Sequence, residues 1–391
     1  MTRSGTPSPL RRARSVAALG LLVALSVSAC SQKAADDASS GSPAEVKKFT
    51  AKVRADVSAA SARQSAHTNP VPASAPRPAR NKKIVVIPCS MSVEGCARPA
   101  RATVQAARAV GWKARIDDPA GDATKMSGAI KRAVSSRADG IVLTAIDASA
   151  VQGDVKAARK AGLAVVCNMC GNTGNLYQAV IPPLKENERA GYLLGEFAYV
   201  EAQKRFKAPP KFIVLTDSEF DTVKARVQGV NKFIADCRAA GAGCTTVAKG
   251  SYLASEISTV APSRVVQMAR SHPDYNVLFA GYDAAMNFFA RGLQQAGLGQ
   301  PDKAFGVSVD ADVANTQMIR KGGFQSAAVG FAFTRAGFGN IDNLNRLFHA
   351  QHPVDQGLTG KLIVKDNVPA GNAWEGDFDT APLYRKTWGM Q

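Results

Sequence analysis

The sequence lacks the short motifs of several enzyme and nucleic-acid-binding classes. Only four of its 391 residues are His, and none of them falls in a loop that follows a predicted strand. It contains no Gly-x-Ser-x-Gly elbow and no Gly-Lys-Ser/Thr phosphate loop, which argues against a hydrolase and against a transporter ATPase. No helix-turn-helix and no basic run accompanies the net charge of +18. We therefore predict no enzymatic activity, no cofactor and no nucleic-acid partner.

Acidic residues are absent from the first 29 positions, where four Arg residues flank or precede an apolar run over residues 16–27. This pattern is typical of a secretory signal, and the run is too short to span a bilayer comfortably. The end of the run, Val27-Ser28-Ala29-Cys30, resembles a bacterial lipobox. We predict a lipoprotein signal peptide over residues 1–29 and an extracytoplasmic protein that lipidated Cys30 anchors to the cell membrane. The alternative is an ordinary signal peptide followed by an unmodified cysteine.

The segment 30–81 offers little apolar surface for a core. It is rich in Ala, Ser and Pro, and four prolines cluster near its end. Such a composition predicts a spacer between the lipid anchor and a folded body. The spacing of Val46, Phe49 and Val53 allows a short helix over residues 44–60. Without the signal peptide the net charge is +14, which we interpret as a solvated basic face near an anionic membrane.

Seven cysteines fit an exported protein. With Cys30 set aside for lipid, an even number remains, which favours disulfides in an oxidising compartment. Of the several connectivities, we predict the local one: Cys89 with Cys96, Cys167 with Cys170, and Cys237 with Cys244. Zinc and thiol redox chemistry remain alternatives for the Cys-x-x-Cys pair. The pair lacks a second ligand pair, and a loop rather than a helix follows it.

Apolar runs alternate with amphipathic helices along residues 82–391. The first run, residues 82–90 (KKIVVIPCS), shows no polar alternation, as expected of a parallel strand that is covered on both faces. We predict strands near residues 84–87, 114–116, 140–143, 164–166, 178–181, 212–215, 245–247, 276–279, 305–309, 325–330 and 358–364. We predict helices near residues 100–110, 123–135, 148–161, 186–204, 223–240, 257–270, 284–296 and 336–350. This order indicates two doubly wound α/β domains in tandem, with ligands at the carboxyl ends of the strands.

Four segments add a resemblance to a known family. Residues 138–143 (ADGIVL), 161–166 (AGLAVV), 279–286 (FAGYDAAM) and 306–310 (GVSVD) are similar, in order and spacing, to segments of type I periplasmic binding proteins. The likeness is greatest to the ribose-binding branch that serves ABC importers, and it covers about residues 82–370.

The resemblance implies two flavodoxin-like domains, each with a parallel sheet, that a three-segment hinge joins near residues 184, 331 and 359. The N-terminal lobe would comprise residues 82–184 plus 331–358, and the C-terminal lobe residues 185–330 plus 359–391. The implied function is that of a monomeric solute-binding lipoprotein. It would capture a small polar ligand, such as a sugar or polyol, between the lobes and deliver it to ABC permease subunits. The alternative is a sensor that presents the ligand to a membrane receptor.

Ligand-binding positions can be carried over from the resemblance one residue at a time. They are Ser90, Ser92, Asn168, Lys224, Tyr282, Asp310 and Phe331. Arg226 is the alternative to Lys224 for the Arg of the family.

The alternative roles are structural: a helix cap for Asp310, core packing for Tyr282, a loop-forming role for Asn168, and a solvated helix position for Lys224. The chain also departs from the family pattern, because no Phe pair follows the first strand and Asn168-Met169 replaces the usual Asp-Arg. We therefore expect a polar ligand other than a simple pentose.

Overall fold

The apolar run near residue 84 forms the central part of a parallel sheet, as the sequence predicts. The computed structural model describes residues 41–390, so the predicted signal peptide (1–29) and lipidation at Cys30 lie outside the described residues. Strand β1 (Lys83–Pro88) is buried from its second residue onward. Ile84 and Val86 contact the core beneath one layer of helices, whereas Val85 and Ile87 contact the core beneath the other. Burial on both faces explains why the run shows no polar alternation.

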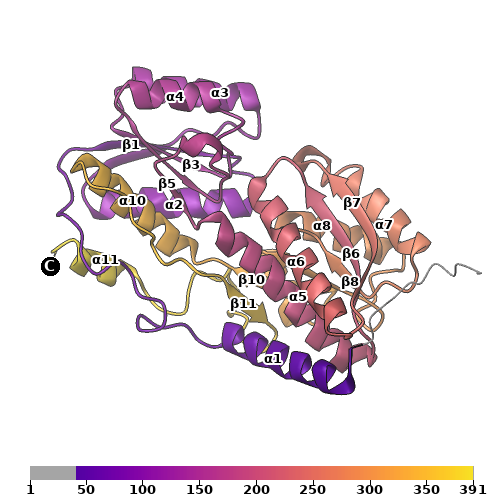
Figure 1. Ribbon diagram of the computed structural model, residues 1–391. Coiled ribbons are helices and arrows are strands. Elements are labelled where there is room, and N and C mark those ends of the chain that lie inside the picture. The colour runs from indigo at the N-terminus through magenta and orange to yellow at the C-terminus, as the bar shows by residue number, and fades with distance from the viewer. Residues whose placement is uncertain (1–40, 391) are drawn as a thin grey trace, which may run out of the picture. The chain divides into compact units, whose positions relative to one another are not determined.

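Five parallel strands form the first sheet, in the order β2-β1-β3-β4-β5. The other strands are β2 (Lys113–Ile116), β3 (Gly140–Thr144), β4 (Ala164–Asn168) and β5 (Ala179–Ile181). Helices α3 (Ala123–Ser135) and α4 (Gln152–Lys160) cover one face, and α2 (Glu94–Ala109) and α10 (Phe333–Phe348) cover the other. Figure 1 shows α2 and α10 side by side across this face. We call this sheet with its helices the first lobe.

Six strands form the second sheet, in the order β11-β10-β9-β8-β6-β7, and only β11 runs antiparallel to its neighbour. The strands are β6 (Lys211–Asp217), β7 (Thr245–Tyr252), β8 (Val277–Phe279), β9 (Phe305–Val309), β10 (Gln325–Gly330) and β11 (Lys361–Val364). Helices α5 (Leu184–Phe206) and α6 (Asp221–Ala239) cover one face, and α7 (Ala261–Ser271) and α8 (Asp283–Gln295) cover the other. This second lobe completes the predicted architecture of two parallel-sheet α/β domains.

Two helices were not predicted, and one of them changes the expected lobe boundary. Helix α9 (Val313–Arg320) follows β9, and α11 (Ala381–Thr387) lies near the C-terminus. Tyr384 and Trp388 pack on Phe338 of α10, with ring centroids 5.6 and 6.1 Å apart. The chain therefore returns to the first lobe after β11, although the sequence placed all of 359–391 in the second lobe. These buried aromatic contacts with α10 are the physical reason for the return.

The described part of the predicted spacer is folded against the body. Helix α1 (Pro43–Ser61) packs on α5, where the Phe49 ring contacts Tyr199 at a centroid distance of 5.5 Å. The Pro-rich segment that follows supplies carbonyl acceptors: Arg335 donates to Asn69 O (2.7 Å) and Pro70 O (2.6 Å). A few apolar side chains and backbone acceptors thus hold this segment in place.

All three predicted cysteine pairs lie at disulfide-bonding distance. The Cα separations are 5.9 Å for Cys89–Cys96, 6.1 Å for Cys167–Cys170 and 5.7 Å for Cys237–Cys244. The first two pairs shape loops at the carboxyl ends of β1 and β4, and the third joins α6 to the segment before β7. No described helix is long and apolar enough to cross a membrane.

Candidate functional site

The carboxyl ends of strands from both sheets meet at one place. Arg98 of α2 donates from Nη1 to the carbonyl of Asp310, which follows β9, at 3.1 Å. Arg226 of α6 approaches the sulfur of Met169, which follows β4, at 4.0 Å from Nη2. Most of the site residues predicted from the sequence lie at these strand ends. We call this region, formed by strand ends and their loops from both lobes, the interlobe site.

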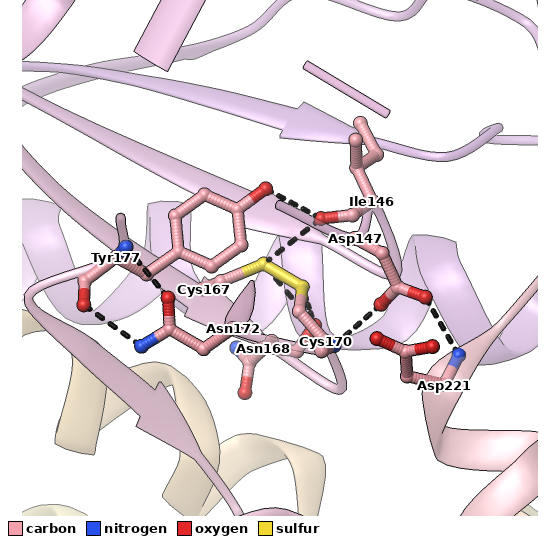
Figure 2. The surroundings of a disulfide bond; sticks show 9 residues. Ile146, Asp147, Cys167, Asn168, Cys170, Asn172, Tyr177 and Asp221 are labelled. Carbon is pink, nitrogen blue, oxygen red and sulfur yellow. Dashed lines mark hydrogen bonds between the residues drawn. A yellow bond between two sulfur atoms is a disulfide. The ribbon is translucent and has the colours of Figure 1, made fainter. Parts of the chain in front are cut away.

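Asn168 is the most informative residue of the interlobe site. It ends β4, is fully buried, and has no hydrogen-bond partner for either its Oδ1 or its Nδ2 atom. Its neighbour in the sheet register, Thr144, is also fully buried and has an unpaired Oγ1 atom. Buried polar groups normally have partners, so this pair marks a place where hydrogen-bonding capacity is left over. Figure 2 shows the Asn168 side chain pointing away from the Cys167–Cys170 disulfide.

Asn187 is a third residue with an unpaired polar atom near the same strand end. Its Oδ1 accepts from Nε of Arg226 at 3.0 Å, but its buried Nδ2 has no partner. Arg226 in turn approaches Met169, the residue after Asn168. The two unpaired Nδ2 donors therefore come from different lobes, Asn168 from the first and Asn187 from the second. Arg226 links them, because it contacts both Asn187 and Met169.

Arg226, rather than Lys224, lies in the interlobe site. Its guanidinium donates to Gly281 O at 3.0 Å and pairs with Asp310 Oδ1 at 3.3 Å, and the residue is only 3% exposed. The Lys224 side chain is 47% exposed and pairs with Asp221 on the surface at 2.5 Å. Between the two residues that the sequence left open, the structure therefore gives the buried position to Arg226. Gly191 and Gly229 let α5 and α6 approach closely here, because a Cβ atom at either position would overlap the facing backbone.

Asp310 is held in an unusual backbone conformation. Its φ of 121° lies outside the region that most side chains adopt, so the surrounding structure must stabilise it. Its carboxylate pairs with Arg226 and does not cap the following helix, where Asp312 occupies the N-cap position. Burial raises the pKa of Asp310, and the nearby cations Arg226 and Arg98 oppose that rise. Asp310 therefore does not serve as a helix cap, which was the alternative role considered from the sequence.

Asp283 connects the strand ends of the second lobe to one another. It accepts hydrogen bonds from Ser308 Oγ, from the Asp312 backbone N–H (2.8 Å) and from Gln325 Nε2 (3.1 Å). Burial, followed by the charge of Asp310, raises its pKa to about 7. These contacts join α8, β9 and β10, so Asp283 is part of the support for Asp310.

Tyr282 and Phe331 are packed into the second lobe. The Tyr282 hydroxyl donates to Asp217 Oδ2 at 3.0 Å, and its ring lies against Phe220 and Tyr252. Burial raises the pKa of Asp217 to about 6. Phe331 is fully buried in the core beneath α5. For both aromatic residues the structure supports core packing, the alternative considered for Tyr282.

Ser90 and Ser92 differ in their surroundings. Ser90 Oγ lies 2.8 Å from Ser92 Oγ and accepts from the Ser92 backbone N–H at 3.2 Å, so Ser90 helps to shape its own loop. Ser92 is exposed and borders a cavity of about 920 Å³ that is lined mainly by α8, α9 and the segment before α7. Among the described residues that line this cavity, those of the first lobe are residues 92–94, where the loop after β1 meets the start of α2.

Arg98 is an important residue that the sequence analysis missed. It donates to Asp312 Oδ1 (2.7 Å), Glu375 Oε1 (2.8 Å) and Trp374 O (2.6 Å), and it stacks over the Phe333 ring. It therefore joins α2 of the first lobe to the second lobe and to the C-terminal segment. No local signal could identify it, because its acceptors lie more than 200 positions away along the chain.

Comparison with known proteins identifies the family. Residues 84–346 match a family described as "Periplasmic binding protein domain". The chain belongs to this family of periplasmic binding proteins. Members of the family are non-enzymatic solute binders, which agrees with the prediction of no enzymatic activity. The resemblance noted in the sequence is confirmed, and residues 1–83 and 347–391 lie outside the match.

Solved structures support the type I fold. A glucose-galactose binding protein from Geobacillus stearothermophilus is 16% identical, with a TM-score of 0.64 over 75% of this chain and 100% of its own. A solute-binding protein from Mycobacterium smegmatis with bound glycerol is 18% identical, with a TM-score of 0.64 over the same shares. A Bacillus halodurans protein with bound myo-inositol has 15% identity and a TM-score of 0.62 over 74% of this chain and 96% of its own. No curated protein matches the sequence.

Proposed function

We propose that this periplasmic binding protein captures a small uncharged polyhydroxylated molecule, a sugar or a polyol, in the interlobe site and delivers it to an ABC importer. The observation that carries the proposal is Asn168, which is fully buried at a strand end with neither polar atom of its amide paired. An amide offers both donors and an acceptor, and a hydroxyl group of a ligand can use both kinds.

The pairing of charges supports an uncharged ligand. Asp310 pairs with Arg226, and Asp312 pairs with Arg98 at 2.7 Å, so these four charged groups already have partners. The unpaired buried groups near β4 are neutral: the Asn168 amide, the Thr144 hydroxyl and the Asn187 amide nitrogen. A charged ligand would need an opposite charge to offset its desolvation, whereas a hydroxylated ligand can use neutral donors and acceptors. The sugars and polyols named for proteins of similar fold agree with this class.

The proposed membrane anchor, location and protein partners rest on the sequence. Cys30 would carry the lipid that anchors the protein outside the cytoplasm, and permease subunits would be its partners. The protein would act as a monomer whose two lobes separate to admit the ligand and close over it.

A thermal shift screen tests the proposed function. Purified residues 31–391 are mixed with sugars, polyols and related metabolites at millimolar concentration, and the melting temperature is recorded. A ligand that binds only the folded state at 100 times its Kd adds about 2.7 kcal/mol to the free energy of unfolding, so at least one compound should raise the melting temperature by several degrees. Absence of any shift across the panel would contradict the proposal. Equilibrium dialysis with the best compound then separates true binding from a solvent effect.

A further inference from the structure

None of the helices α5 to α9 in the second lobe is capped by the side chain of its own N-cap residue. In α6 the N-cap residue is Phe220, which has no side-chain acceptor, and in α9 the side chain of the N-cap residue Asp312 makes no capping hydrogen bond. The first backbone N–H groups of a helix have no partner within the helix, so they need an acceptor from elsewhere. For α6 and α9 that acceptor comes from the other lobe.

Asp147 supplies the acceptor for α6. It lies in the loop after β3 in the first lobe, and its Oδ2 atom accepts from the backbone N–H of Asp221 at 2.6 Å. Its Oδ1 atom accepts from the backbone N–H of Gly171, the residue after the Cys167–Cys170 disulfide. Figure 2 shows the Asp147 carboxylate between the disulfide loop and the start of α6. Asp147 is 4% exposed, so both hydrogen bonds form away from solvent.

The backbone is fitted closely around this contact. A Cβ atom at Gly171 would collide with the side chain of Asp221. Only glycine therefore lets the disulfide loop of the first lobe lie against the start of α6.

Glu94 supplies the acceptor for α9. It opens α2 in the first lobe, and both of its carboxylate oxygens lie within hydrogen-bonding distance of the Val313 backbone N–H, at 3.2 and 3.3 Å. The Cys89–Cys96 disulfide ties this first turn of α2 to the end of β1. A negative side chain at a helix N-terminus also interacts favourably with the helix dipole. In both contacts, therefore, a carboxylate of the first lobe accepts a hydrogen bond from a backbone N–H at the start of a second-lobe helix.

We propose that Asp147 and Glu94 form a closure latch, in which two carboxylates of the first lobe cap α6 and α9 of the second lobe only when the lobes are together. This inference rests on the proposed function, because a latch is useful only in a protein whose lobes separate and close. Each hydrogen bond joins residues on opposite sides of the interlobe site, so separation of the lobes leaves both helix starts uncapped. The latch stabilises the closed arrangement without contacting the ligand.

Hydrogen exchange in the ligand-free protein tests the latch. The variants are Asp147→Ala and Glu94→Ala, and the signals are the peptides that span residues 219–225 and 311–317. A latch couples the two helix starts, so each variant should speed exchange at both peptides by about two- to tenfold, including the one whose own cap is intact. Acceleration only at the helix whose cap was removed would overturn the proposal, as would no acceleration at all.

Asp122→Ala is the matched control. Asp122 caps α3 within the first lobe by accepting from the Lys125 backbone N–H at 2.8 Å. Its loss should speed exchange at the start of α3 and leave α6 and α9 unchanged. If either alanine variant fails to fold, Asp147→Asn and Glu94→Gln keep the shape, remove the charge and should show the same coupled pattern more weakly. Because no ligand is needed, the result stands whether or not the screen for the proposed function finds a binder.

Discussion

The two lobes present different chemistry at the carboxyl ends of their strands. Thr144 and Asn168 of the first lobe are buried neutral groups without a partner, although the paired carboxylate of Asp147 lies nearby, whereas the second lobe offers the paired carboxylates of Asp217, Asp283 and Asp310. The charged groups all have partners, among them Arg226, Tyr282 and Gln325. In the first lobe, the amide of Asn168 and the hydroxyl of Thr144 have none.

The difference follows from the cost of burial. A buried charge without a partner is far more costly than a buried neutral group, so the carboxylates of the second lobe are stable only because other groups pair with them. A neutral amide costs less to leave unpaired, and its atoms stay available for a ligand. We infer that the second lobe supplies a rigid charged frame, and that the free hydrogen-bonding groups are neutral and lie mainly in the first lobe, with Asn187 Nδ2 as the contribution of the second.

Loss of Arg226 should give the largest effect, because it would leave Asp310 buried without its partner. Arg226→Met should lower the free energy of unfolding by about 3–5 kcal/mol, measured by urea denaturation. Lys224→Met is the matched control on the same helix, and it should change stability by about 0.5 kcal/mol or less because its ion pair is exposed. Equal effects of the two substitutions would contradict the idea of a charged frame.

The sequence predicted the fold well where apolar runs are long. Strand β9 was predicted with its observed bounds, and the continuous run before Cys89 correctly indicated a strand covered on both faces. Helices α9 and α11 were missed because each is short and carries mixed polar and apolar residues. Their positions depend on contacts with distant parts of the chain, such as Phe338 for α11.

The candidate site was predictable only in part. Asn168 and Asp310 follow predicted strands, and that position alone brought them to attention. The choice between Lys224 and Arg226 could have been made from helical spacing, because Arg226 follows Val223 by three positions and precedes Val230 by four on the buried face. Asp147 could not be found in this way, because its partner in α6 is 74 positions away and on the other lobe.

The pH dependence of stability tests whether Asp217, one of the carboxylates of the second lobe, carries a buried charge. Burial raises the pKa of this carboxyl from 3.8 to about 6, so in the folded protein it is protonated without penalty below pH 6 and carries a buried charge above it. Its contribution to stability is therefore fully present below about pH 4 and is lost as the pH rises through 6. Relative to Asp217→Asn, the wild type should lose up to about 3 kcal/mol between pH 4 and pH 8.

The measurement for Asp217 is the free energy of unfolding of both proteins at several pH values and constant ionic strength. The difference between the two proteins isolates this group from the other carboxyls. A flat difference for Asp217→Asn would show that its charge is not buried in solution.

Replacement of Asn168 tests the unpaired groups of the first lobe, and here we expect a smaller change in the free energy of unfolding. Neither atom of its amide has a partner, so Asn168→Leu, which has a similar shape, should leave the free energy of unfolding within about 0.5 kcal/mol of the wild type. The same substitution should weaken binding of the best compound from the thermal shift screen by about tenfold, or about 1.4 kcal/mol, measured by calorimetry.

Asn345→Leu is the matched control for Asn168→Leu. The Asn345 amide is also buried, but it donates to Pro76 O at 2.8 Å and accepts from the Ala79 backbone N–H at 2.9 Å. Its replacement should cost about 1–3 kcal/mol of stability and leave ligand affinity unchanged, because both hydrogen bonds hold the N-terminal segment and neither reaches the interlobe site. If Asn168→Leu destabilised the protein as much as Asn345→Leu and left affinity unchanged, the first lobe would have no free hydrogen-bonding group at this position. The contrast between a paired frame and an unpaired recognition surface would then be wrong.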